Sequence, residues 1–115
     1  MADLNLVHRG VDRAVLEELV KRGDDLTTVR QTLVFFLRRK SDARDGELVF
    51  NPLAAELVAR GWTIHSLHAD GISGEAQRLV DPASTNNLST EMEALAAEFG
   101  VNYDGWECAI MGEKK

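Results

Sequence analysis

One short pattern occurs twice in this chain and constrains its fold more than any other feature. The sequence LAAEL at Leu53–Leu57 recurs as LAAEF at Leu95–Phe99, and each copy lies near the end of a segment with helical spacing. A glycine follows each copy, Gly61 or Gly100, and a strand-forming stretch that contains tryptophan comes next. Each helix is also preceded by a strand-forming stretch. This order predicts an α+β fold of the ferredoxin-like, split βαβ (βαββαβ) kind with an antiparallel sheet.

Three segments have the apolar spacing and the terminal residues of helices. Asp12 is expected to cap the first helix, and Asn51 the second, where Pro52 suits the first turn. Thr90 begins a capping-box pattern that predicts the start of the third helix. The helices are therefore expected at residues 12–23, 51–61 and 89–100.

Four stretches rich in β-branched and aromatic residues, or bounded by turn residues, predict strands. In the first of them, Leu33 and Phe35 fall on one side and Arg30 on the other. The glycine-containing stretch at residues 71–75 is expected to be the hairpin that joins the two βαβ halves. The strands are expected at residues 27–39, 62–69, 76–82 and 106–111.

The length and the apolar content fit one domain. A chain of 115 residues with 44% hydrophobic residues can bury one sizeable core. We expect residues 1–26 to form an N-terminal helical extension and residues 27–115 the ferredoxin-like core. No apolar run approaches the roughly 18 residues of a membrane span, and the start lacks signal-peptide features. The single cysteine, Cys108, excludes an internal disulfide and suits a reducing compartment. These features predict a cytoplasmic protein with no membrane partner.

Three potential metal ligands lie close together in the sequence. His65, His68 and Asp70 fall within one short stretch, so a small metal-dependent enzyme is one alternative reading. The two histidines are three positions apart, and on a regular strand such positions point to opposite faces. Ordinary surface histidines are the simpler interpretation. Cys108 has no neighbouring base that would activate its thiol. We therefore expect no metal, no cofactor and no catalytic residue.

The charge balance bears on nucleic-acid binding. The net charge of −6 repels a phosphate backbone, and acidic residues interrupt the basic run at 38–44. Ferredoxin-like RNA-recognition modules stack bases on aromatic residues of adjacent central strands. Phe35 and Phe36 are neighbours in sequence, so only one of them can face outward. We expect no direct contact with nucleic acid, and an RNA-binding module remains the second alternative reading.

The expected fold leaves one face of the sheet without helices. An aromatic side chain there, such as Phe36 or Tyr103, would make that face an interaction surface. The N-terminal helix has an apolar stripe that would suit it to cover the same face. A second copy of the chain could also cover it, which would give a homodimer.

The C-terminal part of the chain resembles a known family. The sequence LAAEFGVNYDGWECAIM resembles the C-terminal half of the RraB family, the regulators of ribonuclease E activity, and residues 95–106 carry the most specific part of the likeness. A helix that ends in ARGW and the order of the elements are similar too. The resemblance implies a non-enzymatic ferredoxin-like domain that inhibits the endonuclease by binding protein. It implies ribonuclease E, or a related RNA-degrading assembly, as the partner.

The succession Tyr-Asp-Gly-Trp at residues 103–106 admits a structural reading and a contact reading. Asp104-Gly105 is a strong turn pair, which predicts a turn that starts the last strand, with Trp106 inward and Tyr103 nearer the rim. An overall acidic protein would suit a basic segment of the implied nuclease. The residues we expect to contact a partner are Tyr103, Asp104, Glu107, Asp24 and Asp25.

Overall fold

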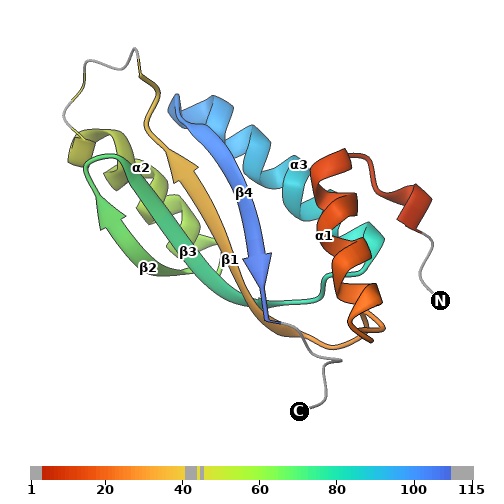
Figure 1. The fold of residues 1–115 in the computed structure, drawn as a ribbon. Helices are drawn as coiled ribbons and strands as arrows, with labels where there is room; N and C mark the ends of the chain where they lie inside the picture. The colour runs from red at the N-terminus through yellow and green to blue at the C-terminus, as the bar shows by residue number, and fades with distance from the viewer. Residues whose placement is uncertain (1–3, 41–43, 45, 110–115) are drawn as a thin grey trace.

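The computed structural model describes residues 4–40, 44 and 46–109 (Figure 1). Within them, one antiparallel sheet has the strand order β2-β3-β1-β4, so β1 lies between β3 and β4. The α+β class is confirmed, and the arrangement is compatible with the expected ferredoxin-like fold. The strands are β1 (Arg30–Leu37), β2 (Thr63–His68), β3 (Gly71–Arg78) and β4 (Asn102–Cys108), and the helices are η1 (Leu4–Leu6), α1 (Gly10–Lys21), α2 (Gly46–Ala59) and α3 (Pro82–Phe99).

All three α-helices lie on the same side of the sheet (Figure 1). Helix α2 packs behind β2 and β3, and α3 packs behind β4. The N-terminal helix α1 lies beside α3, past the β4 edge, and a buried carboxylate of Asp12 joins it to both neighbours. Helix α1 therefore extends the helical layer and does not cover the opposite face of the sheet, which we call the open face.

The two repeated LAAE segments end their helices in the same way. Gly61 and Gly100 have positive φ angles of 94° and 71°, the left-handed conformation that glycine adopts without strain. In both copies the residue after the glycine donates its backbone N–H to a carbonyl five positions earlier, the main bond of a Schellman motif. These bonds join Trp62 to Leu57 and Val101 to Ala96, each at 2.9 Å.

Helix α2 begins earlier than its sequence signals predict. It starts at Gly46, so Asn51 is not its cap and Pro52 lies inside it. The reason is burial, because Val49 and Phe50 continue the apolar stripe of the helix toward its N-terminus and are both buried. Burial of that stripe outweighs the one backbone hydrogen bond that proline cannot make.

Helix α3 also begins earlier, and for a different reason. Asp81 is its N-cap and accepts a hydrogen bond from the backbone N–H of Ser84 at 2.7 Å, with Pro82 in the first turn. Thr90 is therefore inside the helix, and the predicted capping box at that position is wrong. The pair Asp81-Pro82 is typical of a helix start, but the weak strand pattern at residues 76–82 predicted a strand there.

The hairpin lies elsewhere than predicted. The turn is at residues 69–70, and the stretch 71–75 is the first part of β3. Small residues are needed there, since a Cβ on Gly71 would lie 3.0 Å from the carbonyl oxygen of Phe36 on β1. Gly71 therefore allows the close pairing of β3 with β1. Strand β4 likewise starts at Asn102, earlier than expected.

Strand β1 separates its residues into a core side and an open side. Burial alternates along it, and Phe36 is fully buried, so the expectation that Phe36 faces outward is wrong. Its neighbour Phe35 takes the open face, because successive side chains point to opposite sides. The buried residues of the strand are Arg30, Thr32, Val34 and Phe36.

Candidate interaction surface

Strand β4 contains a bulge in the middle of the Tyr-Asp-Gly-Trp sequence. Phe36 of β1 pairs with Tyr103, and Phe35 pairs with Gly105, so Asp104 is the extra residue on β4. Gly105 has a φ of 111°, which glycine tolerates, but it lies within β4 and not in the predicted turn before the strand.

The bulge decides which face each side chain of the motif takes. Tyr103 and Trp106 are three positions apart and would point to opposite faces of a regular strand. The extra residue brings both rings to the side of the helices, and Asp104 and Glu107 are exposed. Trp106 is therefore packed inward as expected.

Tyr103 is half-buried on the helical side of β4. Its ring contacts that of Phe36, with centroids 5.4 Å apart, and the guanidinium of Arg9 lies 5.4 Å from its centroid. Burial raises the pKa of Tyr103, the Asp12 carboxylate adds to the rise, and Arg9 opposes it. Tyr103 thus contributes to the packing between α1 and β4, and only part of it reaches the surface.

The two adjacent carboxylates before β1 have different environments. Asp24 is buried and forms an ion pair with the buried guanidinium of Arg30, and it also accepts a hydrogen bond from the N–H of Leu26 at 2.8 Å. Burial alone would lower the pKa of Arg30, but the bond and the charge of Asp24 raise it. The carboxylate of Asp24 is therefore directed inward and stabilises the start of β1.

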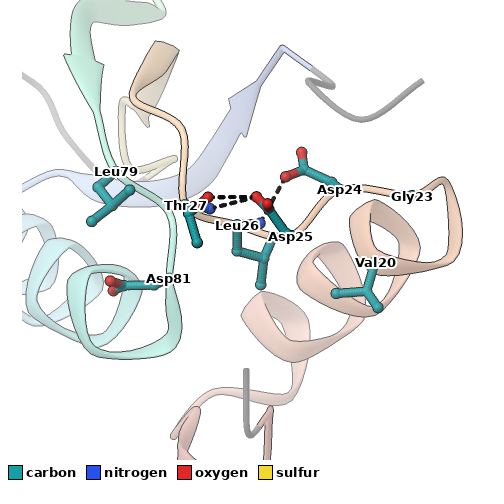
Figure 2. Close-up of a pocket in the computed structure, with 8 residues that line it drawn as sticks. All are labelled: Val20, Gly23, Asp24, Asp25, Leu26, Thr27, Leu79 and Asp81. Atoms are coloured by element: carbon teal, nitrogen blue, oxygen red, sulfur yellow. Dashed lines mark hydrogen bonds between the residues drawn. The ribbon is translucent and has the colours of Figure 1, made fainter. Parts of the chain in front are cut away.

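Asp25 is exposed and is one of the residues that line a pocket of about 620 Å³ (Figure 2). It accepts hydrogen bonds from the hydroxyl of Thr27 at 2.7 Å and from its N–H at 3.0 Å. These bonds lower the pKa of Asp25. The pocket is lined by Val20, Gly23, Asp24, Asp25, Leu26, Thr27, Leu79 and Asp81.

An apolar strip with acidic neighbours crosses the open face, and sequence reasoning missed it. Leu33 on β1 lies opposite Glu75 of β3 on one side and opposite Glu107 of β4 on the other. Phe35, two positions along, lies between Ser73 and Gly105, so its two cross-strand neighbours are small residues. Only the strand register could have revealed these neighbours. We call Leu33, Phe35, Glu75, Asp104 and Glu107 the acidic sheet patch.

The residues of the metal-binding alternative do not form a suitable group. Among residues 4–40, 44 and 46–109, no three histidine, cysteine or acidic side chains come together in a way that could hold a metal ion. His65 approaches the carboxylate of Glu75 at 3.6 Å, and His68 accepts a weak hydrogen bond from the N–H of Asp70. Burial raises the pKa of the Cys108 thiol, which keeps it protonated and a poor nucleophile.

The open face also lacks the arrangement of an RNA-recognition module. The two central strands are β1 and β3, and on their open side Phe35 is the single aromatic residue within the described chain. Glu75 stands on the neighbouring strand, where a basic or aromatic residue would be needed. The side chains on the open side of β1 and β3 therefore do not support direct stacking of RNA bases.

Comparison with known proteins gives a family match. A protein-family model described as RraB, Regulator of ribonuclease activity B, matches residues 9–108. A search of the curated proteins gives no match. The matched range includes every element from α1 to β4, so the N-terminal helix belongs to the shared unit. None of the described helices is both long enough and apolar enough to cross a membrane.

Proposed function

This chain belongs to the RraB family of regulators of ribonuclease activity, and we propose that it binds ribonuclease E, or a related RNA-degrading assembly, and lowers its activity. In this proposal the protein has no enzymatic activity and works in the cytoplasm. Its effect would come from occupying a surface of the nuclease that RNA also needs.

The acidic sheet patch is the observation that carries this proposal. An apolar centre with a polar, charged rim is the usual anatomy of a protein–protein interface. Here the rim is acidic on both sides of Leu33 and the chain has a net charge of −6. Such a surface attracts a segment that is rich in arginine or lysine and also carries apolar side chains. Segments of that kind bind RNA in a nuclease, so the two ligands would compete.

The predicted contact residues fall into an exposed group and a buried or half-buried group. Asp104 and Glu107 are exposed and belong to the patch, and Asp25 is exposed at the loop before β1. Asp24 and Tyr103 would act indirectly, since one is buried against Arg30 and the other packs between Arg9 and Phe36. We therefore assign direct contact to the three exposed carboxylates.

The experiment compares two charge-reversed double variants. Asp104→Lys with Glu107→Lys removes the acidic rim along β4, and Glu17→Lys with Glu98→Lys makes the same change in net charge at exposed positions on α1 and α3. Affinity for purified, RNA-free ribonuclease E is measured by calorimetry, and cleavage of a model RNA is followed with each variant. The patch variant should bind about tenfold more weakly or worse and inhibit correspondingly less.

The control double variant should bind and inhibit almost as the parent does. Equal weakening by both variants would mean that net charge alone matters and that the patch is not the contact surface. A parent protein that neither binds the nuclease nor slows cleavage would overturn the proposed function itself.

A further inference from the structure

A second surface lies between α1 and the edge of the sheet. A groove of about 600 Å³ separates the helix from β4, and its walls are mostly apolar. Val11, on its α1 wall, is 65% exposed and presents an apolar side chain to the groove. The residues that line the groove are Val11, Ala14, Val15, Glu18, Leu19, Trp106, Glu107 and Cys108.

The free edge of the sheet borders this groove. Within the described chain, β4 pairs with β1 alone and is the last strand of the sheet. The N–H of Ala109 donates a hydrogen bond to the carbonyl of Gln31 on β1. This bond shows which residues of β4 direct their backbone groups toward β1. Because the direction of backbone groups alternates along a strand, the N–H and C=O of Trp106 and Cys108 point away from β1. They are available to an additional strand.

We propose, on the basis of the function proposed above, that an extended segment of the partner protein adds to β4 as a fifth strand. Successive side chains of such a segment would point alternately to the two sides of the sheet. One set would enter the apolar groove beside Val11 and Trp106, and the other would lie on the open face beside Asp104 and Glu107. The geometry therefore specifies a segment in which apolar and basic residues alternate.

Charge favours this occupant over a second copy of the chain. The eight lining residues include two glutamates and no basic residue. Glu18 is paired with Arg22 at 3.0 Å, but an exposed pair of this kind is weak and a partner cation can replace it. If two copies joined through their β4 edges, each copy would bring its own Asp104 and Glu107 to the junction. Like charges across paired strands are destabilising.

The test uses the full-length chain and a synthetic peptide of alternating arginine and valine. Amide resonances of the isotope-labelled chain are followed by NMR during the titration. Three controls are used: a peptide with glutamate in place of arginine, a peptide N-methylated on alternate residues, and Val58→Lys, which alters a comparably exposed valine on α2. Val11→Lys is the test variant.

Shifts centred on Trp106, Cys108 and the facing side of α1 are expected with the arginine peptide. Binding should weaken by about tenfold or more with the glutamate peptide, with the N-methylated peptide and in Val11→Lys, but not in Val58→Lys. Undetectable binding, shifts confined to the open face, or equal binding of the N-methylated peptide would overturn the proposal. A dimer that is lost in Val11→Lys would show that a second copy occupies the groove and would overturn it too.

The two proposals fail separately. If the chain inhibits the nuclease but the peptide does not bind at the β4 edge, the fifth-strand inference alone is wrong. If the peptide binds at that edge but the nuclease is neither bound nor inhibited, the groove is a peptide site and the proposed function is wrong.

Discussion

The indole Nε1 of Trp106 on β4 donates a hydrogen bond to the carboxylate of Asp12 on α1 at 3.0 Å. The same carboxylate accepts a hydrogen bond from the hydroxyl of Ser89 on α3. One buried acidic residue thus joins the N-terminal helix to the last helix and the last strand. An isolated short helix is marginal in water, so this junction positions α1 and with it one wall of the groove.

Replacing Asp12 with alanine should destabilise the protein by about 2–4 kcal/mol, because two buried donors lose a charged acceptor. Urea denaturation measures the free energy of unfolding. Glu17→Ala, at an exposed site on the same helix, is the control and should have a small effect. A loss for Asp12→Ala as small as that of the control would show that α1 is held by its apolar contacts alone.

Asp24→Asn should reduce the free energy of unfolding by about 3–5 kcal/mol, since it leaves the buried guanidinium of Arg30 without its counter-charge. Asp25→Asn removes the adjacent, exposed carboxylate and is the matched control. It should shift the thermal midpoint far less than Asp24→Asn does. Equal effects of the two substitutions would contradict the assignment of Asp24 to the interior.

The only tyrosine of the chain offers a clean titration. The pKa of Tyr103 should lie above its ordinary value of 10.0, and Asp12→Asn should lower it by removing a nearby negative charge. Absorbance of the tyrosinate during an alkaline titration measures this pKa. A group whose pKa is raised by folding stabilises the protein fully below its unfolded pKa. Stability should therefore fall as the pH rises past about 10, and an unshifted Tyr103 would contradict its burial.

Gly105→Ala should destabilise the protein by about 1–2 kcal/mol, because an L side chain is strained at a φ of 111° even where space is open. Gly74→Ala is the control on β3. Its added Cβ would meet Trp62 and Val34 at an ordinary 3.6 Å, so that variant should be tolerated. Thermal unfolding compares the two. Equal stability of the two variants would show that the backbone at Gly105 adopts a conformation that any residue can take.

Much of the fold could be predicted from local signals. Short stretches of sequence predict the order of strands and helices. They also predict that a glycine ends each helix after its LAAE segment, and Gly61 and Gly100 adopt the positive φ that such helix ends need. The helix starts could not be placed as well. At Pro52 the tertiary burial of the preceding residues outweighed a local breaker signal, and Asp81-Pro82 carried a start signal that a competing strand pattern obscured.

The site was predictable only in part. Asp104 and Glu107 could be chosen from the motif, but the apolar members of the patch could not. Leu33 belongs to the patch because Glu75 and Glu107 lie opposite it on two different strands. Such pairing joins residues that are far apart in the sequence. The burial of Asp24 could not be predicted either, because nothing in the neighbouring sequence distinguishes Asp24 from Asp25.

The bulge at Asp104 lets β4 carry one residue more than the stretch of β1 with which it pairs. If the four residues from Tyr103 to Trp106 formed a regular strand, strict alternation would send one of the two rings to the open face and one of the two carboxylates toward the core. Removal of Asp104 would leave Tyr103 and Trp106 two positions apart, so both rings would stay on the helical side of a strand without a bulge. The chain can therefore gain or lose an exposed carboxylate at this position without exchanging the two faces of the strand.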